Sequence, residues 1–63
     1  MELVTIYQNK ETKQTYCLFG EISLGTKKVW LYCNEDDTGH SDVLENVENL
    51  NKKYSVIDTY YGD

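Results

Sequence analysis

The stretch Val29-Trp30-Leu31-Tyr32-Cys33 is the part of the sequence that decides the fold. It is rich in β-branched and aromatic residues and shows no helical period, so it predicts a strand. Alternate side chains of a strand point to opposite faces of its sheet, and here both sets are apolar. The rest of the chain therefore has to cover two faces of a sheet.

Two more strands precede this one. Residues 2–8 predict the first strand and residues 15–19 the second, joined by a polar hairpin connection. We expect Gly20 to be a bulge or bend, residues 21–24 to continue the second strand, and residues 25–28 to form the next turn. The three strands predict an antiparallel meander.

The pattern changes after the polar loop of residues 34–40. Val43, Val47, Leu50 and Tyr54 recur at intervals of four, three and four, which predicts one face of a short helix with Ser41 as its N-cap. Asparagines inside this segment leave open that part of it is extended or irregular. Residues 55–60 alternate again and are a candidate fourth strand.

The fold class predicted is a β-rich α+β domain. It consists of the antiparallel three-stranded meander, one short helix and the candidate fourth strand, with a closed SH3-like small barrel as the alternative. A chain of 63 residues has room for one hydrophobic core, so residues 1–63 form a single domain.

Alternation along the strands sorts the apolar residues into two sets. One set holds Val4, Ile6, Cys17, Phe19, Val29, Leu31 and Cys33, and the other holds Leu3, Tyr7, Tyr16, Leu18, Trp30 and Tyr32. We expect Phe19, Val29 and Leu31 to be core residues. The aromatic residues of the second set are either core residues, covered by a closed barrel or by the C-terminal strand, or a partner-binding face. These aromatic residues are Tyr7, Tyr16, Trp30 and Tyr32.

The chain is acidic, with a formal net charge of −5, and its six basic residues are all lysines. The absence of arginine argues against sequence-specific nucleic-acid binding. Six acidic residues are concentrated in a short stretch and predict a binding site for a protein with a basic surface, unless they only keep the chain soluble. These residues are Glu35, Asp36, Asp37, Asp42, Glu45 and Glu48.

Catalytic and metal sites are not expected. Cys17 and Cys33 lack the paired spacing of zinc ligands, and we interpret them as two thiols on neighbouring strands, with a disulfide as the alternative. Nothing in the spacing brings either cysteine to His40, so we expect no enzyme and no cofactor. A partial match to the EF-hand loop begins at an asparagine and follows a strand, so calcium binding is not expected. That match consists of Asn34, Asp36, Thr38, Gly39 and Glu45.

The N-terminal residues have no basic region ahead of an apolar stretch, and no apolar run approaches the length of a membrane span. We therefore expect a cytoplasmic protein that does not contact membranes.

The order of elements resembles that of short SH3-like proteins of phages and mobile elements. The resemblance rests on Tyr7-x-Asn9-Lys10-x-Thr12 at the hairpin, on residues 29–32, and on the late segment Glu48-Asn49-Leu50-Asn51-Lys52-Lys53-Tyr54. It implies a class of small accessory and inhibitor proteins, including anti-CRISPR and other anti-defence factors, some of which mimic DNA. Such a phage protein would work in the host cytoplasm.

The function expected is that of a small acidic binding protein that inhibits or modulates a nucleic-acid-handling host enzyme. One alternative is a small nucleic-acid-binding module in which Trp30 and Tyr32 stack on bases while lysines hold the backbone. These lysines are Lys10, Lys13, Lys27 and Lys28. A second alternative is a regulatory partner such as an antitoxin. A homodimer is a further option.

Overall fold

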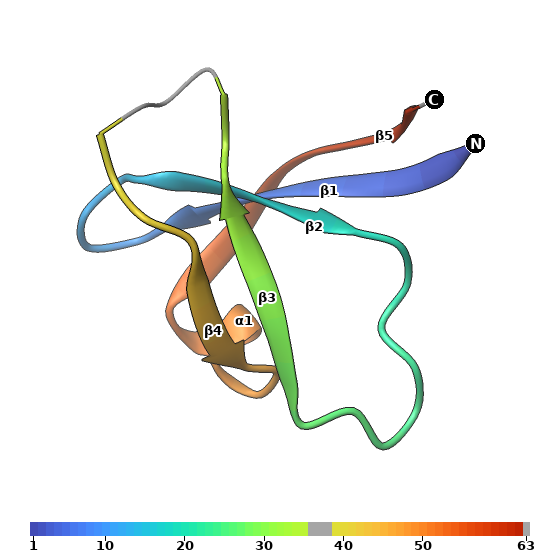
Figure 1. Cartoon of the computed structure of the whole chain (residues 1–63). Helices are drawn as coiled ribbons and strands as arrows, with labels where there is room; N and C mark the ends of the chain where they lie inside the picture. Colours follow the sequence, from blue (N-terminus) through green and yellow to red (C-terminus); the bar gives the residue numbers. More distant parts are fainter. Residues whose placement is uncertain (36–38, 63) are drawn as a thin grey trace.

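The computed structural model describes residues 1–35 and 39–62, which form one antiparallel sheet and one short helix (Figure 1). In chain order the elements are β1 (Glu2–Asn9), β2 (Thr15–Phe19), β3 (Lys28–Cys33), β4 (Val43–Asn46), α1 (Asn49–Lys52) and β5 (Tyr54–Gly62). The sheet has five strands in the order β4-β3-β2-β1-β5. The predicted meander and the candidate last strand are therefore confirmed.

Strand β1 lies between β2 and β5 and pairs with both of them. It pairs with β2 from Val4↔Phe19 to Gln8↔Thr15, and with β5 from Glu2↔Gly62 to Asn9↔Tyr54. A bulge interrupts the second ladder between Ile6 and Tyr7. The chain thus returns at its end to the strand with which it began, as Figure 1 shows.

The turn between β1 and β2 is organised by the side chain of Asn9. Its Oδ1 atom accepts hydrogen bonds from the backbone N–H groups of Glu11 and Thr12, at 2.9 and 3.0 Å. Lys13 then has a φ of 67°, and its N–H donates to the carbonyl oxygen of Asn9. Asparagine suits this position because its side chain mimics a backbone turn.

The second strand ends earlier than predicted. β2 stops at Phe19, and Gly20 has a φ of +79°, a left-handed conformation that a glycine adopts without steric cost. The bend expected at Gly20 is confirmed, whereas the continuation of the strand through residues 21–24 is wrong. Those residues belong to a loop that leads to β3.

The sheet bends sharply beyond β2 and stays open. Only two residue pairs join β2 to β3, whereas four join β3 to β4. In the described part of the chain the edge strands β4 and β5 do not pair with each other, and α1 contacts both of them. The closed barrel is therefore wrong: one turn of helix lies between the two edges.

The helix predicted from Ser41 onwards is largely wrong. Val43–Asn46 is a strand paired with β3, and α1 is a single turn that begins after Glu48. An isolated helix of this length is marginal, so pairing with an available strand determines the conformation. The apolar period still identified core positions, because Val43, Leu50 and Tyr54 all pack into the same cluster.

The core lies on the face of the sheet that α1 covers. Leu31 is fully buried at its centre, and the ring of Tyr54 meets those of Tyr7 and Tyr16 edge-on, at centroid distances of 6.4 and 5.9 Å. Its buried members are Tyr7, Tyr16, Leu18, Leu31, Leu50 and Tyr54. On the opposite face Val4, Ile6 and Cys17 form a second, smaller cluster.

The predicted face assignment holds for β1 and β2 but is inverted on β3. Val4 pairs with Phe19 and Ile6 with Cys17, so these four share a face. Cys17 pairs with Tyr32, which places Tyr32 on that same face and turns Leu31 to the other.

Of the three residues expected in the core, Leu31 is confirmed and Val29 packs against the core while partly buried. Phe19 is 48% exposed, so the prediction that it is a core residue is wrong. It lies on the face that α1 does not cover.

The described residues include no helix that is long and apolar enough to cross a membrane.

We predict that Leu31→Ala lowers the free energy of unfolding by about 2 to 5 kcal/mol, because it opens a cavity at the centre of the core. A domain this small has little stability to lose, so the variant should be largely unfolded in urea titrations followed by circular dichroism. Phe19→Ala is the matched control and should cost clearly less. Equal losses in the two variants would contradict this description of the core.

Candidate functional site

Four large apolar side chains lie next to one another on the face opposite the Leu31 core. The rings of Phe19 on β2 and Tyr32 on β3 are 5.6 Å apart, Trp30 follows on the same side of β3, and Leu44 on β4 pairs with Trp30. They are 42 to 52% exposed. We call Phe19, Tyr32, Trp30 and Leu44 the aromatic strip.

The strip is exposed because the helix covers only one face of the sheet. Leu50 of α1 joins the cluster around Leu31, on the side of β3 from which Trp30 and Tyr32 point away. A strand that buries Leu31 must present its neighbours Trp30 and Tyr32 on the other face. The local strand geometry thus produces both the core and the strip.

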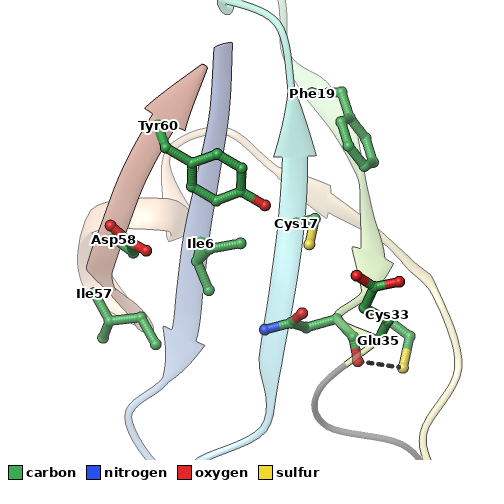
Figure 2. A pocket seen from close by; sticks show the side chains of 9 residues that line it. Ile6, Cys17, Phe19, Cys33, Glu35, Ile57, Asp58 and Tyr60 are labelled. Carbon is green, nitrogen blue, oxygen red and sulfur yellow. Dashed lines mark hydrogen bonds between the residues drawn. The ribbon is translucent and has the colours of Figure 1, made fainter. Parts of the chain in front are cut away.

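A hollow of about 460 Å³ lies beside the strip and shares Phe19 with it (Figure 2). Ile6 and Cys17 form its floor, and Tyr60 and Ile57 of β5 stand on the side away from Phe19. The charged residues that line it, Glu35 and Asp58, are both acidic. A neighbouring hollow of about 470 Å³ is lined by Phe19, Trp30 and Tyr32, and its charged residue is Glu2.

The predicted acidic residues are distributed over several places. Asp36 and Asp37 lie outside the described residues. Asp42 accepts a hydrogen bond of 2.8 Å from the backbone N–H of Cys33, which ties the start of β4 to β3. Glu35 lines the hollow beside the strip, whereas Glu45 and Glu48 line two other hollows, each together with lysines.

Glu45 holds the segment around α1 together. Its Oε1 atom accepts from the side-chain Nδ2 of Asn49 at 2.7 Å and from the backbone N–H of Asn46 at 3.2 Å. Its Oε2 atom accepts from the hydroxyl of Tyr54 at 3.4 Å. The bond from Asn49 is the main reason that the pKa of Glu45 lies below its ordinary value, and nearby Lys53 lowers it further. Glu45 thus has a structural role.

The four predicted aromatic residues divide equally between core and surface. Tyr7 and Tyr16 are buried, and burial raises the pKa of Tyr7 and likewise that of Tyr54. Trp30 and Tyr32 are exposed members of the strip. Phe19 and Leu44 complete the strip but were not predicted as site residues, since only the pairing of β3 with both neighbours reveals them.

The lysines expected to hold a nucleic-acid backbone are not brought together. Lys10 and Lys13 belong to the turn before β2, whereas Lys27 and Lys28 follow the loop after it, at the opposite end of that strand (Figure 1). Lys10 instead lines a hollow with Lys52 and Lys53, and its N–H donates to the carbonyl of Lys53 at 2.8 Å.

His40 contacts β2, and the two cysteines lie on β2 and β3. The Nε2 atom of His40 is 2.9 Å from the carbonyl oxygen of Thr15, and its ring meets that of Tyr16 edge-on at 4.7 Å, which attaches the loop to β2. Cys17 and Cys33 are thiols, so the disulfide alternative is wrong.

The described residues of the partial calcium loop do not form a calcium-binding site. Asp36 and Thr38 lie outside the described residues. Glu45 is on a strand, where its carboxylate accepts hydrogen bonds from Asn49 and Asn46. Among the described residues no three His, Cys, Asp or Glu side chains group as metal ligands would. The absence of calcium binding stays a prediction.

Comparison with protein-family models, with curated proteins and with solved structures found no match to this chain.

We predict that the hydrogen bonds of Glu45 make stability depend on pH. A carboxyl whose pKa is lowered on folding stabilises the protein above the pKa of the unfolded chain, and this contribution is lost as the pH falls through the folded pKa. Glu45→Gln should therefore lose less stability on acidification than the wild type. Urea unfolding of both proteins at neutral and acidic pH measures the difference, and identical losses would contradict this role.

Proposed function

We propose that this chain is a small binding protein that inhibits or modulates a nucleic-acid-handling enzyme, which it contacts through the aromatic strip. The observation that carries the proposal is the continuity of the strip across β2, β3 and β4. Single exposed apolar residues are common, but adjoining ones on a small domain mark an interaction surface. Aromatic residues also supply much of the binding energy at protein interfaces.

Charge around the strip favours a basic partner. The charged residues that line the two hollows beside it are Glu2, Glu35 and Asp58. Lys28 precedes Trp30 on β3 but lines another hollow, together with Glu48. A partner's lysine or arginine would meet carboxylates at the rim and aromatic faces in the middle, an arrangement that supports both ion pairing and cation–π contact.

Nucleic-acid-handling enzymes fit this description because their grooves are lined with basic residues that bind phosphates. An acidic chain with a net charge of −5 can occupy such a groove, as a DNA mimic does. Direct binding to nucleic acid is less well supported, since the strip is bordered by carboxylates and the predicted lysines lie at opposite ends of β2.

We also propose that the chain is related to SH3-like small proteins. The support for it is a bent antiparallel meander that ends in a short helix and a last strand beside the first.

We predict that the strip selects the partner. In capture from a nuclease-treated bacterial lysate, the wild type should retain a nucleic-acid-handling enzyme that the double variant Trp30→Ala, Tyr32→Ala loses. Leu24→Ala is the matched control, because Leu24 is a fully exposed apolar residue outside the strip. The captured enzyme should then be purified and titrated with each variant. Undiminished binding of the double variant would exclude the strip as the contact surface.

We predict that the carboxylates at the rim steer association. Glu2→Gln with Glu35→Gln keeps size and polarity but removes two negative charges, so association with the captured enzyme should slow, and rising salt should slow the wild type in the same way. The affinity of the same variant for single-stranded DNA tests the alternative function, because a less negative protein should bind phosphates more tightly. Stronger binding to DNA with unchanged binding to the enzyme would favour that alternative.

A further inference from the structure

Strand β5 presents a long edge whose side chains point into solvent. It has nine residues, and those at positions 55–61 are all exposed. Its large apolar residues Val56, Ile57, Tyr60 and Tyr61 are 46 to 67% exposed. An edge strand of this kind offers a row of backbone groups to another strand unless lysine, proline or a covering element prevents it. β5 contains neither lysine nor proline.

The other edge of the sheet is protected. β4 has only four residues, a length that limits strand pairing, and α1 follows it closely and packs against it. On β5 the bulge opposite Ile6 and Tyr7 disturbs the edge near Ile57, which leaves Asp58–Gly62 as a regular stretch. The two edges therefore differ, and only β5 is suited to accept a strand.

The direction of the backbone groups on β5 follows from the bonds of β1. The carbonyl of Leu3 accepts from Gly20 N–H, on the β2 side of the strand. Backbone groups of successive residues alternate in direction in an antiparallel ladder, so Val4 bonds towards β5, where it pairs with Tyr60. The N–H and C=O groups of the neighbours of Tyr60, which are Thr59 and Tyr61, consequently point outwards. The outward N–H of Thr59 donates to Oδ1 of Asp58 at 2.9 Å, a bond that a pairing strand has to replace.

We propose that β5 pairs with β5 of a second copy of this chain, antiparallel and centred on Tyr60. In this register Thr59 of each copy exchanges hydrogen bonds with Tyr61 of the other. The N–H of Thr59 then donates to the carbonyl oxygen of Tyr61 in place of Asp58 Oδ1. Tyr60 meets its own counterpart at the two-fold axis. The two sheets would join into one continuous sheet.

The side chains agree with this register. Asp58, the single charged residue of β5, falls opposite Gly62 of the second copy and not opposite another Asp58. Thr59 falls opposite Tyr61, a β-branched residue against an aromatic one, which is a favourable cross-strand pair. This self-complementarity is the reason to assign the edge to a second copy and not to an unrelated strand.

Dimerisation at this edge is separate from the proposed function. The aromatic strip itself lies on β2, β3 and β4, so a dimer leaves it accessible, while Asp58 and Tyr60 of β5 line the hollow beside it. Thr59 lines neither hollow beside the strip. Variants of Thr59 should therefore still bind the partner of the strip, and the failure of one proposal would not imply failure of the other.

The oligomeric state in solution tests the proposal. Sedimentation equilibrium of the wild-type chain, up to millimolar protein, should show a monomer–dimer equilibrium. Thr59→Pro removes an outward N–H from each copy, together with its bond to Asp58, without removing a β1–β5 bond. Because the proline cannot donate to the second strand, the variant should raise the dimer dissociation constant roughly tenfold or more. Thr59→Val keeps the N–H and is the control that should still dimerise. A monomer at every concentration, or equal dimerisation of the proline variant, would overturn the proposal.

Cysteine trapping tests the register. Residues opposite each other in a non-hydrogen-bonded pair have Cα atoms about 4.5 Å apart, within the range of a disulfide. In a Cys33→Ser background, Tyr60→Cys should therefore form a covalent dimer under mild oxidation. Ser55→Cys has no counterpart in β5 of the second copy in this register and should stay monomeric. Equal trapping of both variants, or none of Tyr60→Cys, would overturn the register.

Discussion

The pairing of β2 with β3 is the constraint on which the rest of the structure depends. Only Tyr16↔Cys33 and Cys17↔Tyr32 join the two strands, yet these pairs determine which side of β3 faces the helix. They turn Leu31 towards Tyr16 and Tyr54, and they leave Trp30 and Tyr32 on the opposite face. A shift of one residue would exchange the two faces, because side chains alternate along a strand.

The size of the chain explains why one face stays exposed. A domain of 63 residues buries about 60% of the surface of its unfolded chain, and here one turn of helix supplies the only helical cover in the described part of the structure. Leu50 and the tyrosines complete the core on that side. On the other side Val4, Ile6 and Cys17 are buried between larger neighbours, and the strip remains at the surface. The proposed function and the proposed dimer both use groups that the fold cannot cover itself.

Local patterns in the sequence were sufficient for β1, β2, β3 and β5 but not for β4. Residues 2–8, 15–19 and 29–33 were identified by composition alone, and the last strand by its alternation. The segment from Val43 to Tyr54 was misread because a strand, a turn and one helical turn happened to place apolar residues at helical intervals. Its asparagines were the signal against a full helix. Pairing with β3, a contact between distant parts of the chain, decided the outcome.

The candidate site was predicted in part for the same reason. Trp30 and Tyr32 could be singled out as aromatic residues of the best strand, but alternation gave no way to separate them from Tyr7 and Tyr16, which are core residues. Phe19 and Leu44 join the strip only through pairing across β3. The acidic stretch is contiguous in sequence, whereas folding distributes Glu35, Glu45 and Glu48 over separate hollows.

The face that β3 presents to the core is measured most directly by nuclear Overhauser effects in solution. We predict cross-peaks between the Trp30 ring and the Leu44 methyl groups and between the rings of Phe19 and Tyr32. The Leu31 methyl groups should show cross-peaks to the rings of the core tyrosines. Cross-peaks from the Trp30 ring to Leu50 and Tyr54, with Leu31 near Phe19, would show the opposite face assignment and contradict the account.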